Sequence, residues 1–160
     1  MSEVAKTVTN SQVQMIEIVF PNDANPHGNV FGGRVMQLID IIGGVAAMRH
    51  ARNTVVTASM DKLDFLSSAY IGEVLILNAS VNYVGNTSME VGVKVIAENP
   101  LTGERRHTGS AYVTYVAIDS TGKPVRVPRI VPETEEEKRR FAEAQERRAH
   151  RVAVRKAKGK

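Results

Sequence analysis

Residues 35–48 read Val-Met-Gln-Leu-Ile-Asp-Ile-Ile-Gly-Gly-Val-Ala-Ala-Met and form the most apolar run that precedes the predicted sheet. Its apolar residues recur at the i, i+3, i+4, i+7 spacing of one face of an α-helix. The opposite face carries Met36, Gly43, Gly44 and Ala47, so it is hardly polar either. A helix that is apolar nearly all round must be buried, and we therefore predict a central helix enclosed by the rest of the domain.

Period-two alternation of apolar and polar residues marks the segments after this helix. It predicts a short strand at residues 55–60 and longer strands at residues 75–83, 89–97 and 107–119. Turn formers separate the three long strands, which predicts an antiparallel meander. With a first strand at residues 13–20, the pattern indicates an α+β domain, in which an antiparallel sheet wraps around the central helix.

Composition also divides the chain into three parts. We predict a flexible N-terminus over residues 1–12 and a single domain over residues 13–132, long enough for one core. Thr134 followed by Glu137 is a capping-box pattern, so residues 133–160 are expected to form a polar, peripheral helix with a basic tail. Residues 138–160 hold ten Lys/Arg and two Glu, so the net charge of +4 arises from this end and the remainder is mildly acidic.

Several classes of site and location are excluded or disfavoured by composition. The absence of cysteine excludes disulfides and thiolate nucleophiles, and the four histidines show no ligand spacing, so we predict no metal site. No run reaches the roughly 18 apolar residues of a membrane helix. The first residues lack the apolar segment of a secretory signal. We therefore predict a cytoplasmic protein without a membrane span.

Asp40 is the only charged residue between positions 35 and 48. Burying a lone carboxylate in an apolar helix is costly unless something compensates it. Such a group is a candidate general base or nucleophile, because its surroundings alter its reactivity. The alternative is a structural carboxylate that is hydrogen-bonded to backbone or to a partner arginine.

The loop before the helix, residues 21–29, is dense in turn formers and leads into Gly32 and Gly33. Unpaired N–H groups at a helix start favour a negative oxygen, which suits the oxyanion of acyl transfer and equally a phosphate. His27 is predicted to shape the entrance to this site. Arg105 and Arg106 could bind phosphates, or they could form an exposed pair at a strand end.

Several segments together resemble the signature of the hotdog-fold acyl-CoA thioesterases. The likeness is strongest to the brain-type cytosolic acyl-CoA hydrolases and their single-domain bacterial relatives, over about residues 13–150. The segments include PNDAN (residues 21–25), HGNVFGG (27–33), MQLID (36–40), VTASMD (56–61), SMEV (88–91) and VPETEEEK (131–138).

The resemblance implies an enzyme that hydrolyses fatty acyl-CoA, in which Asp40 and Asn25 act together from two different subunits. Backbone N–H groups of Gly32 and Gly33 are expected to hold the thioester oxygen. Coenzyme A is expected to run along the subunit junction past Ser88, with Arg105 and Arg106 as further candidates and His27 near the entrance. Because this chain has one hotdog domain, a homo-oligomer is implied, as a dimer and a trimer of dimers. No cofactor and no nucleic acid are expected.

Alternatives stay open at this point. Asp40 could activate a water positioned by Asn25, or attack directly and give a mixed anhydride. An acyl-CoA hydratase or dehydratase is a second enzyme hypothesis, because a fold does not determine a function. A protein that binds RNA or a membrane surface through the basic tail is a third hypothesis from a different class.

Overall fold

An antiparallel sheet of five strands forms the centre of the computed structural model, which describes residues 4–159. The strand order is β2-β4-β5-β6-β3. The strands are β2 (Val13–Ile18), β3 (Thr54–Phe65), β4 (Val74–Val84), β5 (Ser88–Glu98) and β6 (Arg105–Ile118). Short turns join β4, β5 and β6, which confirms the predicted meander and the α+β class.

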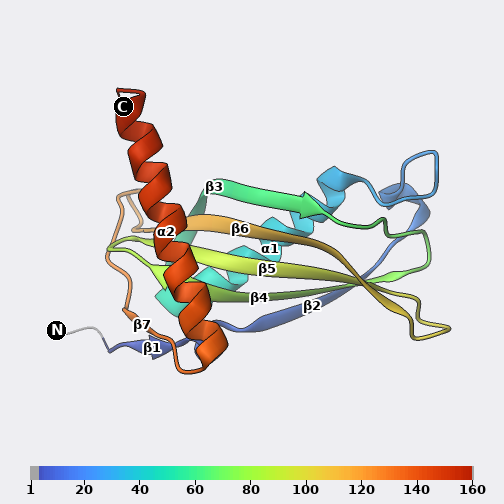
Figure 1. The fold of residues 1–160 in the computed structure, drawn as a ribbon, viewed down its shortest axis with the longest axis horizontal. Coiled ribbons are helices and arrows are strands. Elements are labelled where there is room, and N and C mark those ends of the chain that lie inside the picture. The colour runs from blue at the N-terminus through green and yellow to red at the C-terminus, as the bar shows by residue number, and fades with distance from the viewer. Residues whose placement is uncertain (1–3, 160) are drawn as a thin grey trace.

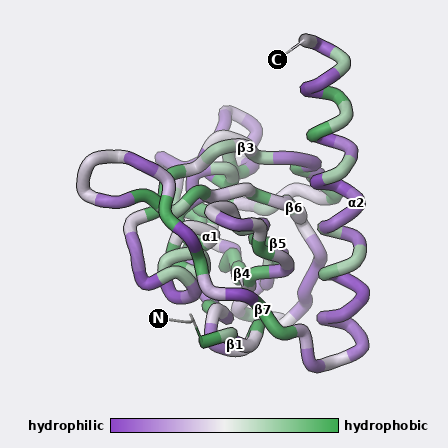
Figure 2. Tube along the Cα trace, turned by 90° about the vertical axis from the view of Figure 1, so that its left-hand side faces the viewer, coloured by the Kyte–Doolittle hydropathy of each residue, from purple (hydrophilic) through white to green (hydrophobic). Residues whose placement is uncertain are grey.

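Two helices cover opposite faces of this sheet. Helix α1 (Gly32–Ala51) lies against one face, and α2 (Glu135–Ala157) crosses the other, as the two perpendicular views show (Figures 1 and 2). The inner face carries aligned apolar rows, such as Val81, Val91 and Val113, which pair across three strands and are fully buried. Each such side chain contributes about 1.5–3 kcal/mol to folding by its burial. The core therefore lies between α1 and the sheet.

The side of α1 that faces away from the sheet is open in the single chain, which corrects the prediction of a helix buried all round. Val35, Leu38, Ile39, Ile42 and Ala46 face the sheet and are buried. Met36, Ile41 and Met48 instead expose 42%, 48% and 43% of their surface. The sheet ends at the edge strand β3, so it has no further strand with which to enclose the helix.

The N-terminal segment differs from its prediction. Residues 1–3 of the predicted flexible part lie outside the described residues. Residues 6–11 form the short strand β1 (Lys6–Thr7) and the 3-10 helix η1 (Val8–Ser11), and β1 pairs with β7 (Ile130–Val131). Val8 and Ser11 are buried, so this part of the segment belongs to the domain.

Helix α2 begins at the predicted capping box. The Thr134 hydroxyl accepts a hydrogen bond from the Glu137 N–H at 3.0 Å. Its contact with the sheet is more than peripheral. Glu90 on β5 is 2% exposed, and Arg147 of α2 binds both its carboxylate oxygens at 2.8 and 2.9 Å. The Arg147 guanidinium also lies 3.6 Å from the centre of the Tyr112 ring. These contacts fix α2 on the outer face of the sheet.

Candidate functional site

Asp40 lies midway along α1, half-buried, where the helix meets β3 and β6. Its Oδ1 accepts hydrogen bonds from Thr57 Oγ1 on β3 at 2.7 Å and from Tyr115 Oη on β6 at 3.1 Å. Within residues 4–159, no cation pairs with this carboxylate and no hydrogen bond reaches its Oδ2. The predicted alternative of a structural carboxylate bound to an arginine is therefore not what the described residues form.

Tyr115 is fully buried in the layer between α1 and the sheet. Burial, and then the neighbouring Asp40 carboxylate, raise the pKa of the Tyr115 phenol far above its ordinary value. The phenol therefore keeps its proton at neutral pH and donates hydrogen bonds. Both groups that bind Asp40 Oδ1 are thus neutral donors, which orient a carboxylate without neutralising its charge.

The surface next to Asp40 is apolar. Ile41 and Met48 on α1 and Val56 on β3 are each more than 40% exposed. Strand β3 is also an edge of the sheet, so one side of its backbone has no strand partner within residues 4–159. An apolar surface beside an unpaired strand edge is typical of a protein–protein contact.

Asn25 lies in the loop before α1, and its side chain shapes that loop. Its Oδ1 accepts hydrogen bonds from the backbone N–H groups of His27 at 2.9 Å and Asn29 at 3.2 Å. The backbone of Gly28 has φ +83°, a conformation that favours glycine, and it completes this tight turn. Because Oδ1 is used in the turn, the amide nitrogen Nδ2 is the polar atom left for a ligand.

A groove of about 390 Å³ adjoins this loop, with Asn25, Asn29, Gly32, Phe65 and Thr108 among its lining residues. Asn29 Oδ1 is buried there and has no hydrogen-bond partner within residues 4–159. Asp40 does not line this groove. The structure therefore brings together Asn25 and Gly32 but not Asn25 and Asp40 within one chain.

Gly32 and Gly33 form the first turn of α1, which follows Phe31. The glycines are exposed, and an added Cβ at Gly33 would meet no atom within 4 Å, so a ligand can approach the backbone closely. His27 is exposed in the same loop. These positions are compatible with binding of the thioester oxygen by the Gly32 and Gly33 N–H groups and with His27 near the entrance to the site. Both roles stay predictions.

Arg105 and Arg106 are engaged in ion pairs within the chain. Arg105 Nε lies 2.8 Å from Glu98 Oε1, and Arg106 binds both oxygens of Glu73 at 2.7 and 3.0 Å. The hydrogen bond from Arg106 lowers the pKa of the Glu73 carboxyl below its usual range. These ion pairs agree with the alternative of strand-end pairs, and phosphate binding by the two arginines stays a prediction.

Ser88 lies at the turn between β4 and β5, where its hydroxyl and the Arg148 guanidinium both border Gly85. The neighbouring groove of about 860 Å³ is lined by Arg126, Arg129 and Arg148 among others. Within residues 4–159, no carboxylate pairs with these three guanidiniums. Arginines that lack carboxylate partners suit phosphate oxygens.

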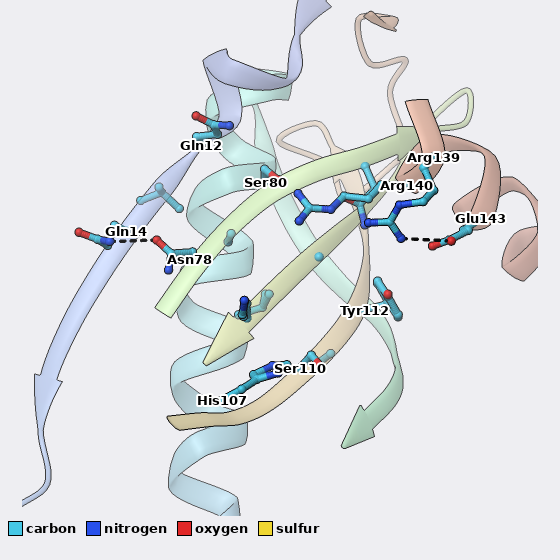
Figure 3. Close-up of a pocket in the computed structure, with 17 residues that line it drawn as sticks. Gln12, Gln14, Asn78, Ser80, His107, Ser110, Tyr112, Arg139, Arg140 and Glu143 are labelled. Carbon is cyan, nitrogen blue, oxygen red and sulfur yellow. Dashed lines mark hydrogen bonds and ion pairs between the residues drawn. The ribbon is translucent and has the colours of Figure 1, made fainter. Parts of the chain in front are cut away.

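Another groove, of about 710 Å³, lies on the outer face of the sheet between the strands and α2 (Figure 3). Gln14 and Asn78 hydrogen-bond each other there at 3.0 Å, and Arg139 of α2 pairs with Glu143 at 3.3 Å. Helix α1, which carries Asp40, lies on the opposite face of the sheet (Figure 3). The outer groove is therefore separate from the Asp40 site.

Neither a metal site nor a membrane helix occurs in the part of the chain that the structure describes. No group of three or more His, Cys, Asp or Glu side chains within residues 4–159 could hold an ion. No helix among these residues is long and apolar enough to cross a membrane.

Thr57 and Tyr115 were not singled out by the sequence. Both lie in strands whose alternation predicts a sheet but not which residue meets which residue of α1. Gly43, in the buried part of α1, was the one available signal, because an added Cβ there would overlap the Tyr115 hydroxyl. A buried glycine in a helix indicates a close contact but does not name its partner.

Comparison with known proteins gives consistent results. Residues 27–104 match the family described as the thioesterase superfamily. An uncharacterized acyl-CoA thioester hydrolase of Bacillus subtilis is 50% identical over 127 residues, which cover 79% of this chain and 74% of that protein. The cytosolic acyl coenzyme A thioester hydrolase of Rattus norvegicus is 40% identical over 143 residues, 88% of this chain. The chain spans 38% of the length of that rat protein.

Solved structures are similar over nearly the whole chain. A hexameric acyl-CoA thioesterase without ligand has a TM-score of 0.91 and 44% identity, covering 94% of this chain and 97% of that one. An acyl-CoA hydrolase of Staphylococcus aureus, in complex with butyryl coenzyme A and coenzyme A, has a TM-score of 0.89 and 37% identity, covering 97% and 94%.

Variants of the Staphylococcus aureus hydrolase have also been solved, in which an asparagine, an aspartate or a threonine is replaced by alanine. In that protein the aspartate follows the asparagine by 15 positions, and the threonine follows the aspartate by 17.

Proposed function

Since this chain belongs to the hotdog-fold acyl-CoA thioesterases of the thioesterase superfamily, we propose that it hydrolyses acyl-CoA thioesters to a free acid and coenzyme A. The observation that carries the proposal is the environment of Asp40. Its Oδ1 is bound by Thr57 and Tyr115, and its Oδ2 has no hydrogen-bond partner within residues 4–159. A carboxylate that is held in place but carries no cation is suited to activating water.

The three residues altered in the Staphylococcus aureus hydrolase have counterparts of the same type and spacing in this chain. Asn25, Asp40 and Thr57 are separated by the same 15 and 17 positions. Thr57 is also the residue that binds Asp40 most closely, at 2.7 Å. We therefore assign these three residues to one reaction centre.

The centre requires two chains. Gly33 and Asp40 are seven residues apart on α1, which separates them by about 10 Å along the helix axis. One thioester carbonyl cannot contact both groups of the same helix. A second copy that packs against Ile41, Met48 and Val56 would bring its own Asn25, Gly32 and Gly33 to Asp40. We propose this dimer, and a trimer of such dimers, as the assembly.

The chemistry then follows from the residue types. N–H groups at the start of α1 polarise the thioester carbonyl and stabilise the oxyanion. Asn25 Nδ2 is not used in the turn, so it can donate to the attacking water and position it. Asp40 removes a proton from that water, whose oxygen attacks the carbonyl carbon. As the C–S bond then breaks, Asp40 returns the proton to the leaving sulfur, so that coenzyme A departs as a thiol and the carboxylate is restored.

Direct attack by Asp40 Oδ2 on the carbonyl is the second route, with a mixed anhydride as the intermediate. Oxygen-18 from water enters Asp40 during a single turnover only if the anhydride forms and water attacks its aspartyl carbon. Absence of label in Asp40 would favour the general-base route.

Substrate and location complete the proposal. Fatty acyl-CoA is the proposed substrate class, with no cofactor besides the coenzyme A that the substrate carries, and the cytoplasm is the proposed location. Ser88 remains a predicted coenzyme A contact. The guanidiniums of Arg126, Arg129 and Arg148 beside it would suit the phosphates of that ligand.

The test is thiol release from a panel of acyl-CoAs of increasing chain length. Wild type should release thiol, and Asp40→Asn should lower kcat by about 10³-fold with its oligomeric state unchanged. Asp61→Asn is the matched control, because Asp61 lies on β3 but pairs with Arg151 at 2.9 Å. A wild type that releases no thiol from any substrate would contradict the proposal.

The remaining alternatives give different results. A hydratase would add water to an enoyl-CoA without releasing thiol. A function of the basic tail would depend on Arg155, Lys156 and Lys158 at the exposed end of α2. Replacing these three by Gln should leave thiol release unchanged under our proposal, and it keeps the contact between Arg147 and Glu90 intact.

A further inference from the structure

We propose that Tyr115 is a positioning residue of the hydrolysis: its buried hydroxyl orients the Asp40 carboxylate, and Gly43 provides the space for that hydroxyl. The inference rests on the proposed function, because it concerns the same carboxylate. It assigns a role to two residues that the sequence motifs did not single out.

The geometry fixes the Tyr115 hydroxyl at Asp40. Tyr115 lies on β6, is 1% exposed and forms part of the core, so packing holds its ring in place. Its Oη lies 2.9 Å from the Asp40 backbone oxygen and 3.1 Å from Oδ1. The hydroxyl proton can be shared between these two acceptors, and both of them keep the hydroxyl against the same residue.

The Tyr115 hydroxyl acts only as a donor toward Asp40. Burial and the adjacent carboxylate raise the pKa of the phenol, so it stays protonated wherever the enzyme is folded and active. A donor to Oδ1 restricts rotation of the carboxylate and leaves Oδ2 for the reacting water. The hydroxyl therefore orients the base without supplying a positive charge.

Gly43 is the second part of the arrangement. It follows Asp40 by three residues on α1, is buried, and faces the Tyr115 ring. A Cβ at this position would overlap the Tyr115 hydroxyl and would lie 3.1 Å from both Cε2 and Cζ. Glycine costs about 1 kcal/mol relative to alanine inside a helix. The clearance for the hydroxyl is a physical reason for glycine here despite that cost.

Thr57 and Tyr115 differ in when they can act. Thr57 is exposed on the edge strand β3, within the surface that we assign to the partner chain. Tyr115 is buried inside a single chain, so its contact with Asp40 exists before any partner arrives. Tyr115 thus prepares the carboxylate within the monomer fold.

The test is Tyr115→Phe, which removes one oxygen and keeps the ring. We expect kcat to fall about tenfold with KM within about twofold of wild type, as for the loss of one hydrogen bond to a charged group. Tyr115 and Thr57 are the side chains that hydrogen-bond Asp40 within residues 4–159, so Thr57 alone would remain.

Two further variants make the test decisive. Tyr112→Phe, on the same strand but facing α2, should leave both kcat and KM unchanged. Gly43→Ala should lower kcat in the wild-type background, and by clearly less in the Tyr115→Phe background, where no hydroxyl needs the space. An unchanged kcat in Tyr115→Phe, or fully additive effects of the Tyr115→Phe and Gly43→Ala substitutions, would overturn the inference. If the wild-type enzyme releases no thiol from any acyl-CoA, the proposed function fails. If the wild-type enzyme releases thiol and Tyr115→Phe does so equally fast, the function stands and the role of Tyr115 fails.

Discussion

Asp40 and Glu90 are two carboxylates on opposite sides of the same sheet, and their surroundings differ. Glu90, on the outer side, is 2% exposed and is bound through both oxygens by Arg147, with Asn82 at 3.3 Å. Asp40, on the inner side, is half-buried and bound through one oxygen by two neutral hydroxyls. Each lies at a contact between a helix and the sheet.

The difference separates a structural carboxylate from a reactive one. The Glu90 carboxylate accepts from Arg147 through both oxygens, so its charge is compensated and it helps to fix α2 on the sheet. A carboxylate that is oriented by hydroxyls keeps its charge uncompensated and one oxygen accessible. Judged by burial alone, Glu90 would be the stronger candidate for a reactive carboxylate. The hydrogen-bond partners of the two groups instead identify Asp40 as the reactive one.

Removing the partner of Glu90 should have the largest effect on stability. Arg147→Met leaves a buried, unpaired carboxylate, and the free energy of unfolding should fall by about 3–5 kcal/mol. Chemical denaturation of wild type and variant measures this difference. The kcat per folded enzyme should stay near the wild-type value, because Arg147 belongs to α2, which lies on the face of the sheet opposite α1 (Figures 1 and 2).

The double variant Arg147→Met with Glu90→Gln is the control for that prediction. It leaves no buried charge, so it should recover a large part of the lost stability. If Arg147→Met lowered kcat as strongly as it lowered stability, the separation between a structural and a reactive carboxylate would not hold.

Removing one donor to Asp40 should affect activity and leave stability nearly unchanged. Thr57→Val preserves side-chain shape on β3, removes the 2.7 Å hydrogen bond, and should lower kcat about 10- to 30-fold. Steady-state thiol release measures the loss. Thr54→Val, at the exposed start of the same strand, is the matched substitution that should cost nothing; equal effects of the two would argue against a specific role of the Thr57 hydroxyl.

Glu73 is a third carboxylate, and like Glu90 it is paired with an arginine. Its replacement should lower the free energy of unfolding by less than the loss of the Glu90 pair. Arg106 lowers the pKa of Glu73 below its ordinary value of 4.5, so the folded state binds a proton less readily than the unfolded state. The stabilisation is therefore fully present above about pH 4.5 and is lost as pH falls through the lower folded value. Glu73→Gln should cost about 1 kcal/mol at pH 7 and less at pH 3, as urea unfolding at both pH values would measure. A cost that did not shrink at low pH would contradict the ion-pair account.

The sequence was sufficient to predict most of the fold. Period-two alternation identified the strands, and the apolar pattern of residues 35–48 identified α1. Asp40 was predictable because a lone charge in an apolar helix stands out locally. These signals are local, so they need no knowledge of which segments pack together.

The partners of the two carboxylates could not be predicted in the same way. Thr57 and Tyr115 meet Asp40 only because of the register of β3 and β6 under α1. Glu90 occupies an outward position in β5, where alternation predicts exposure, and it is buried only because α2 returns over that face. The early strand β1 likewise depends on pairing with residues more than 120 positions later. Such long-range contacts leave no periodic signal in the sequence.

Mixing two inactive variants tests whether Asp40 of one chain and Asn25 of another form one reaction centre. Asp40→Asn and Asn25→Ala chains are each expected to release little thiol alone. After co-refolding at equal amounts, half the dimers should be mixed, and each mixed dimer regains one intact site, which gives about a quarter of the wild-type rate. Activity that stays at the mean of the two parent variants, although mixed dimers have formed, would contradict a centre shared between chains.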